Sequence, residues 1–103
     1  MWYIIYMAGN RKISQAAASA LESGRKMTLS NTSVYDNVLR LHGNAIAKMV
    51  NGELMITDAG WNTPTTRERL NALNGVSVHQ KNFKLYLNDK AWDGSWVKVS
   101  DFN

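Results

Sequence analysis

The stretch LHGNAIAKMVNGELMITDAGWNTPTTRERLNALNG, residues 41–75, decides how this chain folds. Within it, two strand-like runs at residues 45–50 and 53–57 are joined by Asn51 and Gly52. A type I′ turn needs positive φ at both central residues, and Asn followed by Gly is the pair that tolerates this best. The stretch therefore predicts a β-hairpin that turns at Asn51 and Gly52.

The same stretch then predicts the start of a helix. Thr63 can accept a hydrogen bond from one of the first free amides, and Pro64 suits the first helical position because its missing N–H would be unpaired there. Helical spacing assigns three residues to the buried face, which are Thr66, Leu70 and Leu73. Gly75 is a suitable residue for ending the helix.

One more helix and several more strands are expected outside this stretch. Residues 11–23 are rich in alanine, with apolar residues at helical spacing and Gly24 placed to end the helix. The opening run, residues 1–9, is rich in aromatic and β-branched side chains and too short to cross a membrane, so we expect a buried strand. Further short strands are expected at residues 27–29, 34–41, 76–80, 83–87 and 96–99. A bend is expected at Lys81 and Asn82, and residues 34–41 form either one strand or two strands with a break at Asp36 and Asn37.

These elements predict an α+β fold in which a mainly antiparallel sheet has two helices packed on one face. A chain of 103 residues is long enough for one hydrophobic core, and we expect residues 1–103 to form a single globular domain. Cysteine is absent, which excludes disulfides and thiolate metal sites. Hydrophobic residues make up 45% and charged residues 19%, as in globular rather than disordered proteins.

Positive charge is concentrated in the first half of the chain. The net charge is +4, and all of the excess lies in residues 1–50. Two adjacent basic pairs flank the expected first helix, Arg11 with Lys12 at its start and Arg25 with Lys26 just past its end. A basic pair at the start of a helix opposes the helix dipole, so helix stabilisation does not explain why Arg11 and Lys12 are at this position. Phosphate contact is one reading of these pairs, and a solvated basic surface is the other.

The segment that leads into the second helix is another candidate binding site. A helix N-terminus can hold a phosphate or carboxylate through its free N–H groups, and here Trp61 and Thr63 precede the helix while Arg67 and Arg69 lie in its first turns. Because helical spacing gives the buried face to other residues, we expect both arginines to project without a packing role. The structural alternative is that Thr63 only caps the helix, Trp61 packs the entering chain against the core, and the arginines are solvated.

Three aromatic residues stand beside polar neighbours and are expected to face solvent: Tyr35, Trp92 and Trp96. Such residues could stack single-stranded bases, and packing in the core or on an edge strand is the alternative. Catalysis by His42 is disfavoured because no Ser, Asp or Glu stands at triad spacing, and the two histidines match no metal-ligand pattern. We therefore expect no catalytic residue, no metal and no cofactor.

Four motifs in order resemble a family of small accessory proteins of tailed bacteriophages. They are LHGNAIA at 41–47, ITDAGWNTPTTRERLNAL at 56–73, VSVHQKNFKLYLN at 76–88 and WDG at 92–94. The resemblance implies the cytoplasm of an infected bacterial host and an accessory protein rather than a capsid component. No site residue follows from it.

The function most consistent with these observations is non-enzymatic, namely binding of nucleic acid by a phage accessory protein. The candidate binding residues are Arg11, Lys12, Arg25, Lys26, Trp61, Thr63, Arg67 and Arg69. The alternative is a protein-binding inhibitor of a host enzyme or anti-phage defence complex. Salt sensitivity separates the two, because phosphate binding weakens through counterion release as salt rises. No membrane partner is expected, since no apolar run is long enough to span a bilayer.

Overall fold

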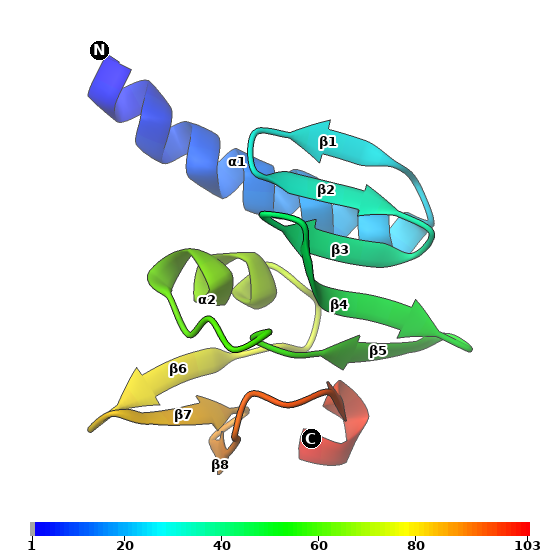
Figure 1. Cartoon of the computed structure of the whole chain (residues 1–103), viewed down its shortest axis with the longest axis vertical. Helices are drawn as coiled ribbons and strands as arrows, with labels where there is room; N and C mark the ends of the chain where they lie inside the picture. Colours follow the sequence, from blue (N-terminus) through cyan, green and yellow to red (C-terminus); the bar gives the residue numbers. More distant parts are fainter. Residues whose placement is uncertain (1) are drawn as a thin grey trace.

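The computed structural model describes the backbone of residues 2–103 and the side chains of residues 11–103. Figure 1 shows two helices, α1 (Trp2–Ser23) and α2 (Pro64–Asn71), beside a set of short strands, with a 3₁₀ turn at Val99–Phe102 near the C-terminus. The strands are β1 (Met27–Leu29), β2 (Thr32–Tyr35), β3 (Val38–Leu41), β4 (Asn44–Val50), β5 (Glu53–Ile56), β6 (Val78–Lys81), β7 (Lys84–Leu87), β8 (Lys90–Ala91) and β9 (Val97–Lys98).

The strands form two antiparallel sheets, which confirms the mainly antiparallel α+β fold. The larger sheet has six strands in the order β1-β2-β3-β4-β5-β9, and the smaller one has three in the order β6-β7-β8. Between β5 and β6 the chain forms α2 and its flanking loops, so the second set of strands starts a separate sheet. Helix α1 lies against β1 to β4, and α2 contacts α1, β4 and β6.

Two-residue turns connect most neighbouring strands. The predicted turn is confirmed, because Asn51 and Gly52 have φ of 53° and 79° between β4 and β5. Four other links also have positive φ at both central residues, and they are Asp36-Asn37, His42-Gly43, Asn82-Phe83 and Asn88-Asp89. Because these links are so short, strands that are consecutive in the sequence are also neighbours in the sheet.

The bend of the β6–β7 hairpin lies one residue later than the sequence suggests. We expected it at Lys81 and Asn82, but Lys81 pairs with Lys84 and the bend is at Asn82 and Phe83. A one-residue shift moves side chains to the opposite face of a strand. With the observed register, Leu87 is buried and Phe83 is placed at the tip.

The main core lies between the six-stranded sheet and α1. Strand residues such as Val34, Leu39 and Ile56 are buried, as are Ala17 and Leu21 of the helix. Alanine on the buried face of α1 lets the helix approach the strands closely. The alanine-rich segment that the sequence assigns to a helix therefore packs on the sheet.

The prediction of a buried strand at residues 1–9 is wrong over residues 2–9, and Met1 lies outside the described residues. Helix α1 begins at Trp2 and runs without a break to Ser23. A short apolar run cannot be assigned to helix or strand by periodicity alone, and no proline interrupts it before the alanine-rich segment. Arg11 and Lys12 therefore lie within the helix rather than at its start, which removes the conflict with the helix dipole.

Trp92 was expected to face solvent, and this prediction is wrong. Its side chain is only 6% exposed and belongs to the hydrophobic core. The indole N–H donates to the carbonyl of Ser95 at 2.9 Å, so the polar end of the ring is satisfied within the Trp92–Ser95 turn. Tyr35 and Trp96, by contrast, are exposed as expected.

Thr63 caps α2 as predicted. Its Oγ1 accepts a hydrogen bond from the Thr66 N–H at 3.1 Å, and Pro64 occupies the first turn. We expect Thr63→Ala to lower the free energy of unfolding by about 1 kcal/mol, the usual cost of a lost cap. Urea denaturation measures this change, and Thr65→Ala is the control because Thr65 makes no capping bond in the structure. Equal effects at the two positions would contradict the role of the cap.

Candidate functional site

The structure does not bring the two predicted basic pairs together. Arg11 and Lys12 lie on α1 and are exposed, whereas Arg25 and Lys26 lie between the end of α1 and β1. Twelve residues, 13–24, lie between Lys12 and Arg25, and the thirteen steps from one to the other correspond to about 20 Å at the helical rise per residue. Arg25 is also engaged locally, since its guanidinium donates to the hydroxyls of Ser19 and Ser23, each at 2.8 Å.

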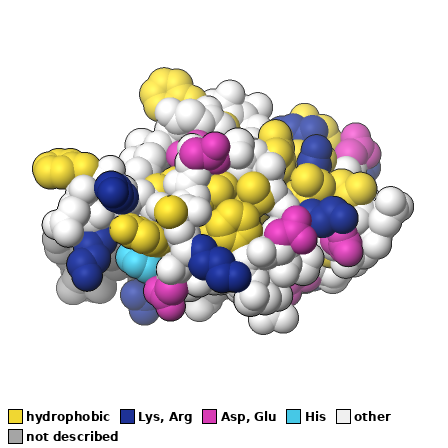
Figure 2. Space-filling view, turned by 90° about the horizontal axis from the view of Figure 1, so that it is seen from below, with side chains coloured by type: hydrophobic (Ala, Val, Ile, Leu, Met, Phe, Trp, Pro, Cys, Tyr) yellow, Lys and Arg dark blue, Asp and Glu magenta, His cyan; other side chains and the backbone are white. Residues whose placement is uncertain are grey.

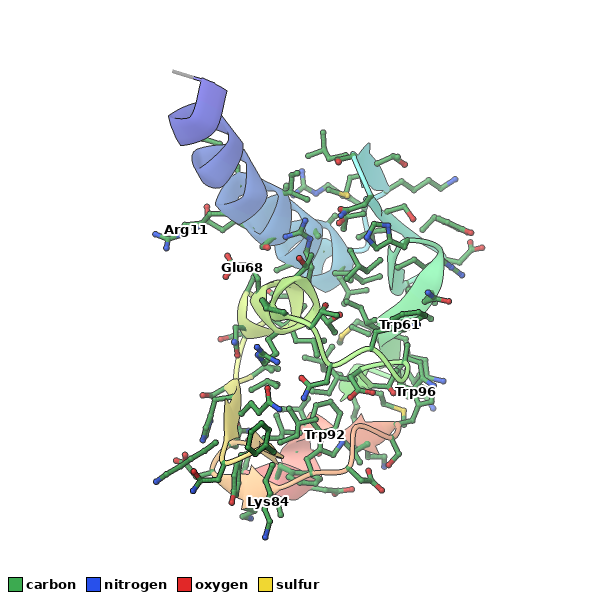
Figure 3. The ribbon with its side chains drawn as sticks, turned by 60° about the vertical axis from the view of Figure 1, so that its left-hand side comes forward. Arg11, Trp61, Glu68, Lys84, Trp92 and Trp96 are labelled. Atoms are coloured by element: carbon green, nitrogen blue, oxygen red, sulfur yellow. The ribbon has the colours of Figure 1, made fainter. Side chains whose placement is uncertain are left out.

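Arg11 is an exposed residue of α1 that has an acidic residue of α2 near it. It lines a shallow depression together with Glu68, and Figure 3 shows these two labelled side chains across the gap between α1 and α2. A carboxylate beside a guanidinium weakens its attraction for a phosphate. Of the two pairs, Arg25 and Lys26 are therefore better placed for an anionic partner.

Arg69 is buried, so the expectation that it projects without a packing role is wrong. Its side chain is 1% exposed. From α2 it reaches Ser14 Oγ of α1 at 2.7 Å, Thr32 Oγ1 of β2 at 2.9 Å and Asn31 Oδ1 at 3.3 Å. Helical spacing contained this signal, because Arg69 follows Thr66 by three residues and both lie on one face. Arg69 ties three elements together and is not accessible to a partner.

Arg67 is partly exposed but not free. Its guanidinium donates to Asn62 Oδ1 at 2.8 Å and to Gln80 Oε1 of β6 at 3.4 Å. It therefore links the loop before α2 to the smaller sheet. The two arginines that the sequence grouped as one site have different structural surroundings.

Trp61 forms one wall of a cavity of about 380 Å³ at the N-terminal end of α2. The ring is 61% exposed, so it does not pack into the core. The cavity also takes in Thr63 and the β3–β4 turn at His42, which the sequence did not connect. The carboxylate of Asp58 accepts from the Gly60 N–H at 2.8 Å, and this negative charge at the lining disfavours an anion there.

The outer face of the six-stranded sheet, opposite α1, carries aromatic and basic side chains. Strand register places Tyr35 opposite Val38, and Val38 opposite Lys48 of β4. Because residues paired in this way lie on the same face, they form a row across the sheet. Tyr35 and Trp96 are 43% and 38% exposed at this face.

Each exposed ring on this face has a basic group over it. The Arg40 guanidinium carbon lies 3.9 Å from the centre of the Tyr35 ring, and Lys48 Nζ lies 4.4 Å from the centre of the Trp96 ring. Such contacts fix the position of a cation beside an aromatic surface. The outer face thus offers two adjacent pairs, Tyr35 with Arg40 and Trp96 with Lys48, which we call the cation–aromatic pairs.

Lys98 lies on the same face but has an acidic partner. Its Nζ is 3.0 Å from Glu53 Oε2. The hydrogen bond with Glu53, followed by the attraction between the two charges, raises the pKa of Lys98. Lys98 is therefore less available for an incoming anion than Arg40 and Lys48.

Sequence reasoning did not select Arg40 or Lys48 as site residues. The signal was available in the alternation of side chains along β3, where Leu39 and Leu41 are buried and Arg40 points the other way. Along β4 the alternation of buried and exposed side chains is interrupted before Lys48, because the neighbours Ile46 and Ala47 are both buried. The pairing of β3 with β4 is also irregular there, at Leu39/Arg40. The position of Lys48 on the outer face therefore could not be predicted from the sequence.

The described part of the chain contains no cluster of three or more His, Cys, Asp or Glu side chains that could hold a metal ion. No helix among the described residues is long and apolar enough to cross a membrane.

Comparison with known protein families places most of the chain in one family model. The family model described as Kyanoviridae Gp96 protein matches residues 10–103. This range covers both sheets, α2 and all but the first turns of α1. No curated protein and no solved structure matches the chain.

Proposed function

We propose a binding function for this chain, which belongs to the Kyanoviridae Gp96 protein family of bacteriophages. The ligand is single-stranded nucleic acid, and the binding surface is the outer face of the six-stranded sheet. The phage protein acts without catalysis, in the cytoplasm of the infected bacterial host. The observation that supports this most is the presence of the cation–aromatic pairs on one open sheet face.

The chemistry of the cation–aromatic pairs suits a single strand. Aromatic rings stack bases of any sequence, while Arg and Lys attract the phosphates between them. Tyr35 lies on β2 and Lys48 on β4, and Trp96 directly precedes β9 at the far edge. At the usual strand spacing, the row from β2 to β9 spans about 20 Å, room for several nucleotides. In a duplex the faces of the bases are stacked inside, so a duplex would contact only the basic groups of this surface and not its aromatic rings.

Part of the surface predicted from the sequence adjoins this face. Arg25 and Lys26 come directly before β1, the edge strand next to β2, and extend the positive charge along that edge. In Figure 3, Trp61 is labelled on the same side of the molecule as Trp96. We therefore retain Arg25, Lys26 and Trp61 as proposed contacts and assign structural roles to Thr63, Arg67 and Arg69. Arg11 and Lys12 lie outside the proposed surface and serve as control positions in the binding experiment.

The test is a binding titration with a fluorescein-labelled oligonucleotide of about 16 nucleotides, at salt concentrations from about 50 to 200 mM. We expect binding that weakens steeply with salt, and a loss of at least about 10-fold in the double variant Arg40→Glu/Lys48→Glu. The double variant Arg11→Glu/Lys12→Glu has the same change in net charge and should lose much less.

Two outcomes would contradict the proposal. Equal losses in the two double variants would mean that total charge, rather than the outer sheet face, governs binding. No binding at about 50 mM salt, where phosphate contacts are strongest, would reject the nucleic-acid function. Unfolding curves of both variants verify that the loss does not come from a damaged fold.

A protein partner is the second candidate, and the cavity beside Trp61 is the observation that favours it. An exposed tryptophan beside an apolar hollow is a frequent centre of protein interfaces. In this alternative the phage protein inhibits a host enzyme or anti-phage defence complex. Binding to host protein that survives nuclease treatment and is lost in Trp61→Ala would support it.

A further inference from the structure

The tip of the β6–β7 hairpin carries a phenylalanine with little contact to the rest of the protein. Phe83 is 96% exposed, the largest value among the exposed large hydrophobic side chains. Figure 2 looks at the molecule from below and shows a projecting hydrophobic side chain with basic side chains near it at the left-hand end, where Figure 1 places this hairpin. An apolar ring in this position gains nothing for the fold from burial.

The backbone at Phe83 is also unfavourable. Its φ is +66°, in the left-handed region that bulky residues rarely adopt. At the same position of the other two-residue turns, the chain has residues that tolerate positive φ, namely Asn37, Gly43, Gly52 and Asp89. A strained position that contributes no packing is expected where the side chain serves a function.

The face of the hairpin beside Phe83 is basic and aromatic. Lys81 pairs directly with Lys84, and His79 pairs with Tyr86. Both pairs lie on one face, because side chains alternate along a strand and Val78 and Leu87 are buried on the other. The His79 and Tyr86 rings are stacked, with centres 5.3 Å apart and planes 14° from parallel.

The Lys81 and Lys84 pair is unfavourable for the isolated protein. Like charges directly opposite each other destabilise a pair of strands. Neither β6 nor β7 contains an acidic residue that could compensate them. Figure 3 shows Lys84 at the lower end of the molecule, pointing outward. An anionic ligand would relieve this repulsion.

We infer that the β6–β7 hairpin is a second contact for single-stranded nucleic acid, in which a base stacks on Phe83 while phosphates lie between Lys81 and Lys84. This inference rests on the proposed function and adds a site to it. An exposed ring with cations beside it and no acid on either strand matches the alternating bases and phosphates of a single strand. A protein interface more often has charges of both signs at its rim.

The decisive experiment compares stability and affinity in the same variants. Phe83→Gly removes the strain of the turn, so we expect the thermal midpoint to rise by about 3 °C while affinity for the labelled oligonucleotide falls roughly 10-fold. Lys81→Ala/Lys84→Ala removes the repulsion and should likewise raise the midpoint while reducing affinity and its dependence on salt. A purely structural role would move stability and affinity in the same direction.

Asp89→Gly is the matched control. It places glycine at the same position of the β7–β8 turn, where the native φ is +66°, and should raise stability without weakening binding. Unchanged affinity in Phe83→Gly, with a wild-type protein that binds, would overturn the hairpin inference and leave the proposed function intact. No binding by the wild-type protein would reject the proposed function and the inference with it. Phe83-dependent binding to vesicles of anionic lipid, without Phe83-dependent oligonucleotide binding, would assign the hairpin to membranes instead.

Discussion

Replacing Arg69 with alanine is expected to lower the free energy of unfolding by about 3 kcal/mol. The guanidinium donates to Ser14 on α1, Thr32 on β2 and Asn31 in the turn before β2, so it joins both helices to the sheet. Ser14 and Thr32 are each 1% exposed, and their oxygens would lose this donor at a place that water reaches poorly. The substitution also leaves a cavity next to Leu70.

Denaturant unfolding of three variants would isolate the cause of this loss. Arg67→Ala is the control, because Arg67 is partly exposed, and we expect it to cost less than about 1 kcal/mol. Arg69→Met keeps most of the volume but none of the donors, so a cost close to that of Arg69→Ala would attribute the effect to hydrogen bonding. If Arg69→Ala were as stable as Arg67→Ala, the buried network would have no energetic importance.

Gly94→Val is expected to be about as damaging, at about 3 kcal/mol. Gly94 has φ of +87°, and a Cβ atom added to it would overlap the carboxylate of Asp58. The Gly94 carbonyl also accepts from the Thr57 hydroxyl and from the Asp58 N–H at 3.0 Å. A shift of the backbone that relieved the overlap would break these bonds, which join the end of β5 to the segment before β9.

Gly52→Val is the matched control for Gly94. Its φ is +79°, but an added Cβ meets nothing within 4 Å, so only the backbone penalty of about 1–2 kcal/mol applies. The sequence alone ranks these two positions in the opposite order, because Asn51 and Gly52 give the stronger turn signal. Thermal and chemical unfolding of both variants decide between the two orders. A smaller loss at Gly94 than at Gly52 would mean that Asp58 moves aside freely.

Local chemistry made several elements predictable from the sequence. Asn51 with Gly52 specified a turn, and Thr63 with Pro64 specified a helix start, because each pair satisfies a backbone requirement within a few residues. Residues 2–9 were assigned wrongly, since their apolar content suits a strand or a helix equally well. The division of the strands into two sheets also had no local signal, because it depends on which strands pair across long separations.

The candidate sites were less predictable, for a different physical reason. Charge suggested that Arg69 lies on the surface, yet three polar partners from distant segments make its burial favourable. Trp92 was assigned to solvent from its polar neighbours, although its N–H is satisfied by Ser95. Phe83 was expected within a strand, and only the register of β6 and β7 places it at a tip.

The position of β9 has a consequence for the order of folding. Strands β2 to β5 are joined by two-residue turns, so their pairing closes short loops and can form quickly. Val97 of β9 pairs with Ile56 of β5, about forty residues earlier in the chain. Closing this long loop is slower than forming the hairpins. The side of β5 that does not pair with β4 should therefore stay exposed until the C-terminal segment docks. During synthesis β5 would therefore be an exposed edge that can pair with another copy of the chain.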